Sequence, residues 1–550
     1  MQSKLISSLE KCFLDECVED KVEYVKGSCL KEEKYRFQFC YSAKEAERRL
    51  QIKITIESEL RDRISVFKVE NVPVQMAHYH YKTDENYLRT TPGLYPDVLL
   101  PIPGEKKIIY PSQTLQSVLF EVDTRGLEKA GVYPITLKLY DFDGNFVEEN
   151  TFTLEVIDAV LPKQTLINTQ WFYCDCLMDY YRTGEFDDRH FEIIENFVKT
   201  AADHGMNMIL TPVFTPPLDT LVGGERTTNQ LVDITLENGA YSFDFTKLYR
   251  FVDICLKNGM KYFEIAHFFT QWGAEHCPKI MATVDGEKKK IFGWETDATS
   301  PEYRKFLEAF IPALLSALKE KGVDKNSVFH ISDEPKREQL EQYRAARAMV
   351  EDLLEGYTIM DAMSDYEFYE TGALTCPIPG SNHIEPFLEN KVPDLWTYYC
   401  CSQAQEVSNR FIAQPSARNR VMGVQMYKYD IKGFLHWGYN FYNNRYSIAN
   451  INPYIIVDGE YFAPAGDTFS VYPAGDGTAL ASIRLAVFHD GLQDMQAMAL
   501  LESLTSKEYV VSLIDEGIEP ITFKSYPHSA KWLLEMREKI NMAIKENAAK

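Results

Sequence analysis

Long apolar runs are missing from this 550-residue chain, and no stretch approaches the roughly 18 uncharged apolar residues that a membrane-spanning helix needs. Near the N-terminus, Glu, Lys and Asp interrupt the apolar residues, so the apolar core of a signal peptide does not form. Positive charge is scarce as well, because 58 Lys and Arg stand against 81 Asp and Glu, a net charge of −23. Since such an acidic surface repels phosphate backbones and anionic lipids, we expect a cytoplasmic protein that binds neither nucleic acid nor membranes.

Cysteines with the spacing of a metal or redox motif are also absent. The eleven cysteines are an odd number, so they cannot all be joined within one chain. The two closest clusters, Cys174/Cys176 and Cys400/Cys401, lack CxxC spacing and a matched second pair of ligands. We therefore expect reduced thiols, no metal site and no organic cofactor.

The first part of the chain is rich in strand signals. Residues 35–158 contain short runs of β-branched and aromatic residues, such as YRFQFCYSA, VYPITLKLYDFDG and NTFTLEVID. Turn signals such as Asp143-Gly144 separate these runs, and no helical periodicity lies between them. The pattern predicts an N-terminal β-sandwich over residues 1–160.

After Leu161-Pro162, strand candidates alternate with amphipathic stretches, which is typical of βα units that build a parallel sheet. Eight candidates predict a (β/α)8 barrel over residues 161–505, incomplete or distorted near its weak sixth strand. Residues 506–550 are expected to form a helical extension on its outside. The predicted strands are residues 165–173, 206–212, 261–269, 327–333, 357–363, 373–378, 394–400 and 433–440.

Barrel enzymes hold their chemistry at the C-terminal strand ends, where the loops converge. The fourth predicted strand ends in VFHISDEP, which brings two adjacent carboxylates, Asp333 and Glu334, to this mouth. Alternation along the strand directs His330, Ser332 and Glu334 toward the barrel interior. Repulsion and partial desolvation raise the pKa of one of two neighbouring carboxyl groups, so one acts as an acid while the other stays charged. This division suits glycoside cleavage, although many Asp-Glu pairs simply begin an exposed helix.

A glycosidase that works by double displacement needs a second carboxylate about 5–5.5 Å from the first. The seventh and eighth predicted strands offer no acid at the required level. Asp361 on the fifth predicted strand and Asp365 in the following loop remain candidates for such a nucleophile. Hydrolysis assisted by the substrate needs no protein nucleophile, because the 2-acetamido oxygen of the sugar attacks the anomeric carbon. The residues alone leave both routes open.

Three segments carry more specific motifs: ISDEP (331–335), LHWGYNFY (435–442) and GDTFSVYPAGDGTALASIRLAVFHDGLQD (466–494). They resemble glycoside hydrolase family 123, the β-N-acetylgalactosaminidase family, and the uncharacterised-domain family DUF4091 found with it. The DUF4091-like region covers about residues 430–500. A β-sandwich before a barrel also matches the family layout, so the resemblance covers most of the chain. His489 departs from it, since related sequences often have Arg there.

The resemblance implies an exo-acting, retaining hydrolase that releases terminal β-linked N-acetylgalactosamine from an oligosaccharide or glycoconjugate. It implies Asp333 as the residue that orients the acetamido group and Glu334 as the general acid/base. Trp437 is expected to stack on the sugar, with Tyr398 or Tyr399 bonded to the acetamido oxygen. Further candidates for sugar binding at the strand ends are Trp171, His267, Gln271, Asn440 and Asp361.

Two other functions stay open at this point. One is a catalytically silent carbohydrate-binding protein on the same scaffold. The other is a glycosidase that uses Asp361 or Asp365 as nucleophile on a sugar without an acetamido group. Outside the mouth, Arg484 is expected to pair with Asp490 or Asp494.

Overall fold

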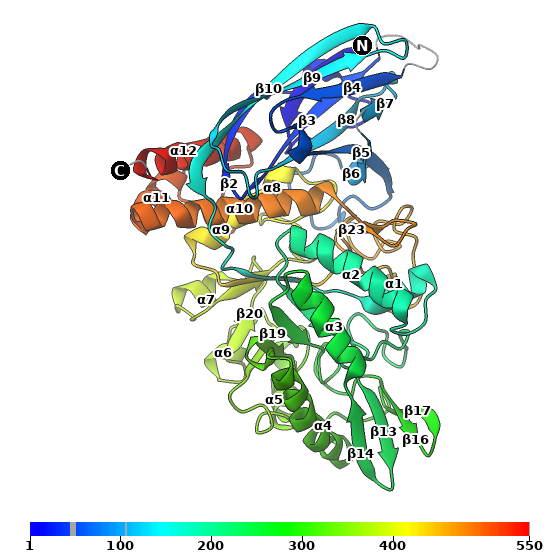
Figure 1. Ribbon diagram of the computed structural model, residues 1–550. Coiled ribbons are helices and arrows are strands. Elements are labelled where there is room, and N and C mark those ends of the chain that lie inside the picture. The colour runs from blue at the N-terminus through cyan, green and yellow to red at the C-terminus, as the bar shows by residue number, and fades with distance from the viewer. Residues whose placement is uncertain (44–50, 105–106, 549–550) are drawn as a thin grey trace.

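The computed structural model describes residues 1–43, 51–104 and 107–548. A β-sandwich forms the top of the molecule in Figure 1, a barrel lies below it, and the long helix α10 runs between the two. Within the described residues, no helix is both long and apolar enough to cross a membrane. All eleven cysteines are free.

The N-terminal sandwich consists of two five-stranded sheets with the orders β1-β3-β8-β5-β6 and β2-β10-β9-β4-β7. The pairing is antiparallel except between β2 and β10. Phe37 of the first sheet stacks on Phe152 of the second with ring centroids 4.2 Å apart, so the apolar faces meet between the sheets. The all-β prediction is confirmed. The strands are β1 (Gln2–Ser7), β2 (Lys26–Lys31), β3 (Lys34–Ser42), β4 (Ile52–Glu57), β5 (Ile64–Val74), β6 (Gly93–Pro101), β7 (Lys107–Ile109), β8 (Gln116–Asp123), β9 (Gly131–Tyr140) and β10 (Phe146–Val160).

The barrel is one sheet of eight strands in the order β20-β19-β18-β15-β12-β11-β22-β21, and neighbouring strands are parallel. Each strand lies inside one of the eight predicted segments, which confirms the barrel, but each is shorter. The fourth strand ends early because Ile331 N–H donates to the side-chain carboxylate of Asp361 (3.0 Å) instead of to a backbone carbonyl of the neighbouring strand. The strands are β11 (Ile167–Gln170), β12 (Met208–Thr211), β15 (Tyr262–Ile265), β18 (Ser327–Phe329), β19 (Thr358–Ala362), β20 (Cys376–Ile378), β21 (Trp396–Tyr398) and β22 (Gly433–His436).

The barrel is nearly closed at its sixth strand, as the weak pattern there predicts. Beyond β20 the chain still reaches β21, because Ser381 N–H donates to Tyr398 O (2.8 Å) and Tyr398 N–H donates to Pro379 O (3.1 Å). Among the helices that alternate with the strands, those beside β20 are short. The helices are α1 (Cys174–Tyr181), α2 (Asp188–Asp203), α3 (Thr246–Lys257), α4 (Pro301–Glu320), α5 (Leu340–Ala348), α6 (Glu367–Glu370), α7 (Glu385–Glu389), α8 (Ser416–Arg420) and α9 (Met422–Lys428).

A four-stranded sheet inserted into the barrel was not predicted. It contains β13 (Asp233–Glu237), β14 (Ala240–Asp244), β16 (Ile280–Val284) and β17 (Glu287–Phe292), in the order β14-β13-β16-β17. Each of its two hairpins turns on two residues with positive φ, Asn238-Gly239 and Asp285-Gly286. These pairs are the strongest short-range hairpin signals in a sequence, so the insertion was visible in it.

The C-terminal part joins the barrel to the sandwich. Helix α10 (Ile483–Leu504) follows the small hairpin of β23 (Val471–Pro473) and β24 (Ala479–Ala481), and α11 (Lys507–Ile514) and α12 (Ala530–Ala548) complete the chain. The prediction for Arg484 is wrong, because its Nε donates to Asp97 of β6 (2.8 Å). Asp490 pairs with Arg36, and Asp494 accepts from Arg420 Nε (2.7 Å).

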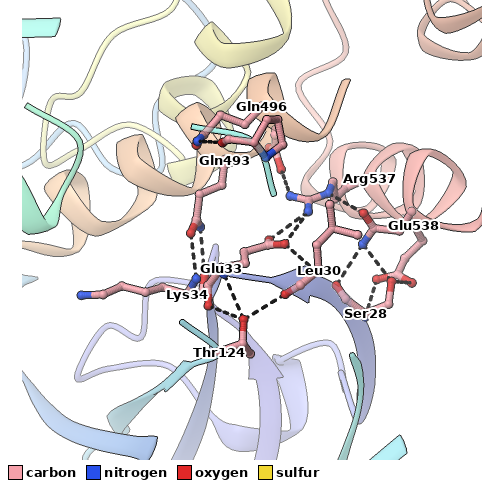
Figure 2. A network of polar contacts seen from close by, with 12 residues as sticks. Ser28, Leu30, Glu33, Lys34, Thr124, Gln493, Gln496, Arg537 and Glu538 are labelled. Carbon is pink, nitrogen blue, oxygen red and sulfur yellow. Dashed lines mark hydrogen bonds and ion pairs between the residues drawn. The ribbon is translucent and has the colours of Figure 1, made fainter. Parts of the chain in front are cut away.

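A polar network at this junction is drawn in Figure 2. Arg537 of α12 lies 2.8 Å from Glu33 of the sandwich and also 2.8 Å from Asp494 of α10. The Gln493 side chain accepts from Lys34 N–H (2.8 Å) and donates to Lys34 O (2.9 Å), as a strand neighbour would. We propose domain boundaries after residues 160 and 505, since β10 ends at Val160 and α10 at Leu504.

Candidate active site

A cavity of about 440 Å³ opens at the C-terminal ends of the barrel strands. Its walls come from the segments that follow several different strands, which is the arrangement of an active site in this fold. Six residues named from the sequence line it: Trp171, Gln271, Asp333, Glu334, Tyr398 and Trp437.

Asp333 and Glu334 are both half-buried in this lining. Glu334 has φ of +43°, a left-handed conformation that an L residue adopts only at a cost of about 1–2 kcal/mol. Its N–H donates to Ala362 O (3.2 Å), and Asp333 O accepts from Trp272 N–H (2.8 Å). The turn at Glu334 breaks the alternation of the strand, so the two neighbouring side chains share one cavity instead of facing opposite sides.

The environment favours protons on this pair. Burial raises the pKa of Asp333 well above its ordinary value, and the nearby charges of Glu334 and Asp361 raise it further. Burial also raises the pKa of Glu334, while a hydrogen bond from the Tyr398 hydroxyl opposes that rise. Burial and the mutual repulsion of the two carboxyl groups therefore favour retention of a proton on the pair, which an acid catalyst requires.

The aromatic residues of the cavity are held by hydrogen bonds from their polar atoms. Trp437 Nε1 donates to Asp467 Oδ2 (2.8 Å), and its half-buried ring meets Phe462 edge-on at 5.8 Å. Trp171 Nε1 donates to Glu264 Oε1 (2.8 Å). Because these contacts fix the ring planes, the cavity presents preformed apolar surfaces.

Tyr399 and Asn440, two of the residues named from the sequence, lie outside the cavity lining. Tyr399 follows Tyr398 on the strand and so points the other way, where its hydroxyl donates to Asn419 Oδ1 (2.9 Å). The Asn440 side chain accepts from Tyr173 N–H (2.8 Å) and donates to Tyr173 O (3.0 Å). Tyr399 and Asn440 are therefore structural, and of the two tyrosines only Tyr398 reaches the site.

Asp361 is also outside the lining, in the centre of the barrel. It is fully buried, its Oδ2 accepts from the Tyr343 hydroxyl (2.6 Å), and its Oδ1 lies 3.1 Å from His330 Nδ1. A carboxylate bonded on both oxygens and shut off from the cavity cannot attack a sugar. Asp365 does not line the cavity either, and its side chain accepts from Glu367 N–H (3.1 Å). These contacts disfavour the alternative with Asp361 or Asp365 as nucleophile.

His267, expected to bind sugar, instead stacks on His330 with ring centroids 4.4 Å apart. Ligand atoms of His267, His330 and Asp361 lie within 4.8 Å of one another, close enough for a metal ion. Burial lowers the pKa of His330, but its bonds to Asp361 and Glu264 outweigh burial and raise that pKa to about 10. A protonated imidazole has no free lone pair, so this donor set does not suit a metal.

The cavity also contains residues that were not predicted to bind substrate: Asp219, Trp272, Lys336, Arg445 and Tyr446. Burial raises the pKa of Asp219 to about 6, and its Oδ2 accepts from Tyr446 N–H (2.9 Å). Asp219 lies in the segment after β12, so the rule that strand ends carry the site would have found it.

Comparison with known proteins shows the class of protein to which this chain belongs. A sequence model described as the catalytic domain of glycoside hydrolase 123 matches residues 171–501, more than half of the chain. The protein is a glycoside hydrolase. More narrowly, the chain belongs to glycoside hydrolase family 123, as its motifs suggest. The likeness of residues 430–500 to DUF4091 stays a prediction.

One solved structure supports the fold. A family 123 glycoside hydrolase from Clostridium perfringens, 14% identical, aligns over 99% of this chain and 97% of its own with a TM-score of 0.73. A β-glucuronidase from Parabacteroides merdae is 10% identical over 89% of this chain and 51% of its own, with a TM-score of 0.31. An endo-β-1,4-mannanase from Thermotoga petrophila is 9% identical over 61% of this chain and 77% of its own, with a TM-score of 0.32. The TM-scores of the glucuronidase and the mannanase are too low to support any statement about the fold. No curated protein matches the chain.

Proposed function

We propose that the chain releases terminal β-linked N-acetylgalactosamine from an oligosaccharide or glycoconjugate by retaining, substrate-assisted hydrolysis. One observation carries this proposal: the adjacent Asp333 and Glu334 line one cavity, and Asp219 is the one other acid in its described lining. Asp219 is held by a backbone N–H (2.9 Å) and is buried. We therefore assign the attack on the anomeric carbon to the acetamido oxygen of the substrate.

In the first step Glu334 gives its proton to the glycosidic oxygen as the bond to the anomeric carbon breaks. The acetamido oxygen forms the new bond, which yields a cyclic oxazolinium ion. Asp333 accepts the acetamido N–H and balances the positive charge that grows there. An N–H donor beside Asp333 favours its charged form, so the proton of the pair belongs to Glu334 once substrate is bound.

In the second step the Glu334 carboxylate takes a proton from water, and that water attacks the anomeric carbon from the side of the departed group. The oxazolinium ring opens and the product keeps the β configuration. Trp437 supports the apolar face of the sugar, and the buried Gln271 Oε1, which has no partner among the described residues, is free to accept from a sugar hydroxyl.

The proposed substrate class comes from a structural relative. The structurally similar enzyme of Clostridium perfringens hydrolyses glycolipid glycans. We extend this substrate class to the present chain as part of the proposed function.

Paired aryl glycosides test the proposal. Turnover of the β-N-acetylgalactosaminide without turnover of the β-galactoside supports assistance by the acetamido group. The reverse result contradicts it. Binding of both sugars without turnover of either indicates a carbohydrate-binding protein on the same scaffold.

A further inference from the structure

The outer end of the cavity consists of residues that the proposed hydrolysis does not use. Trp272, Lys336 and Arg445 are exposed members of the lining, whereas Trp171 and Tyr173 are buried members. An exo-acting enzyme holds the released sugar at the closed end of its site and the leaving group at the open end. The three exposed side chains therefore belong to the half of the cavity that receives the leaving group.

Trp272 is built into this position. Its backbone is left-handed, with φ of +56°, and Ala274 two residues on has φ of +54°. Trp272 N–H donates to Asp333 O (2.8 Å), the Gln339 side chain donates to Trp272 O, and Gln342 Nε2 donates to Ala274 O (3.0 Å). Strained backbone that its surroundings hold in this way is typical of ligand clamps. The backbone of Trp272, whose side chain is 36% exposed, is thus tied to the residue beside the general acid.

Arg445 lies beside Tyr446, whose ring contacts Trp272. The Tyr446 ring meets the Trp272 ring edge-on with centroids 5.8 Å apart. The Arg445 guanidinium lies 4.6 Å from the centre of the Tyr446 ring, within the range of a cation–π contact. Tyr446 is itself fixed, because its N–H donates to Asp219 Oδ2 (2.9 Å).

Both cations of the mouth lack an ion-pair partner. Within the ranges that the structure describes, no carboxylate oxygen lies within 4.0 Å of Lys336 Nζ or the Arg445 guanidinium. In a chain with 81 acidic and 58 basic residues, acids to pair with are abundant. Two cations without an ion-pair partner among the described residues therefore line one cavity and are available to a ligand.

We propose that this mouth is a subsite for an anionic leaving group. The sugar next to the cleaved bond stacks on Trp272, and a carboxylate or sulfate on that sugar or its branch binds Lys336 and Arg445. This inference rests on the proposed function and narrows its substrates to acidic glycans.

The charge of the leaving group is tested with matched oligosaccharides. In each, β-N-acetylgalactosamine is linked to galactose, and the galactose is unmodified, sialylated or sulfated, so that the arms separate carboxylate from sulfate. The measured quantity is the ratio of kcat/KM for an acidic oligosaccharide to kcat/KM for the neutral one. In the double variant Lys336→Gln/Arg445→Gln, we expect this ratio to fall about fivefold for at least one acidic oligosaccharide. The exposed Lys305 on α4 provides the control, since Lys305→Gln should leave that ratio unchanged. An equal ratio in native enzyme and double variant for both acidic arms would overturn the inference.

The stacking of the leaving-group sugar on Trp272 is tested with a substrate whose leaving group is very small. N-acetylgalactosaminyl fluoride releases a single atom, so it makes no contact with Trp272. Trp272→Ala should lower kcat/KM about fivefold more for the neutral disaccharide than for the fluoride. Equal losses of kcat/KM for the two substrates would contradict the stacking of the sugar on Trp272. Native enzyme that cleaves neither the fluoride nor the disaccharide lacks the proposed function, and the inference falls with it. If the enzyme cleaves the fluoride but neither the charge of the leaving group nor the Trp272→Ala substitution changes the relative rates, the inference is wrong and the proposed function still stands.

Discussion

His330 Nε2 lies 2.8 Å from Glu264 Oε1 in the centre of the barrel, where both side chains are fully buried. Asp361 flanks the other ring nitrogen, so a cation is enclosed by two carboxylates directly beneath the active-site pair. Asp361 also accepts from Ile331 N–H (3.0 Å), two residues before Asp333. The buried network therefore fixes the backbone that carries the catalytic acids.

The charge of His330 makes stability depend on pH. Its folded-state pKa of about 10 lies above its ordinary value of 6.5, so the unfolded chain loses this proton first as the pH rises. The stabilisation is complete below pH 6.5 and is lost as the pH rises through about 10. In urea denaturation, we expect the difference in free energy of unfolding between the native protein and His330→Gln to shrink by a few kcal/mol between about pH 6 and pH 9. A constant difference over that range would mean that His330 is neutral.

Glu334→Gln removes the proposed general acid while keeping its size. We expect kcat/KM for β-N-acetylgalactosaminides with poor leaving groups to fall about 10²–10⁴-fold, and to fall less for activated aryl groups. The exposed Glu341 on α5 provides a matched control. A similar loss in Glu341→Gln, or no dependence on the leaving group in Glu334→Gln, would speak against the assignment.

Tyr398→Phe removes the hydroxyl that donates to Glu334. That bond opposes the effect of burial on the pKa of Glu334, so its loss should raise this pKa further. The general acid then keeps its proton to higher pH. We expect the basic limb of the pH profile of kcat/KM to move upward in the variant, and a limb that stays or moves downward would contradict this role for Tyr398.

The ion pair between Arg484 and Asp97 joins α10 to the sandwich, and both side chains are buried. Removal of one partner leaves an unpaired buried charge, so Arg484→Met should cost about 3–5 kcal/mol in the free energy of unfolding. Arg484→Met/Asp97→Leu should recover part of this loss. Urea denaturation measures both. The exposed pair Lys539–Glu516 is the control, and an equal cost for Lys539→Gln would show that the buried pair contributes nothing special.

The sequence predicts the strands well because each carries its own apolar pattern, and it predicts Asp333 and Glu334 because they end such a strand. It misplaces Asp361, which also ends a strand, because the burial of its carboxylate depends on His330 beside the neighbouring strand β18. Tyr398 and Tyr399 are neighbours on an extended segment, so their side chains point in opposite directions. A shift of one residue in the predicted alternation exchanges the two, and the sequence therefore does not show which of them faces the site. Trp272, Lys336 and Arg445, which were not predicted to bind substrate, lie in loops without a repeating pattern, where only the fold brings them together.

The attack by the substrate's own acetamido oxygen is tested most directly with a series of β-N-acetylgalactosaminides that carry zero to three fluorine atoms on the acetyl methyl group. Each fluorine withdraws electrons from the attacking oxygen without changing the leaving group. The account predicts that log kcat/KM falls steeply and steadily along the series. A rate that does not depend on fluorination would contradict it, and would assign the attack to a group of the protein.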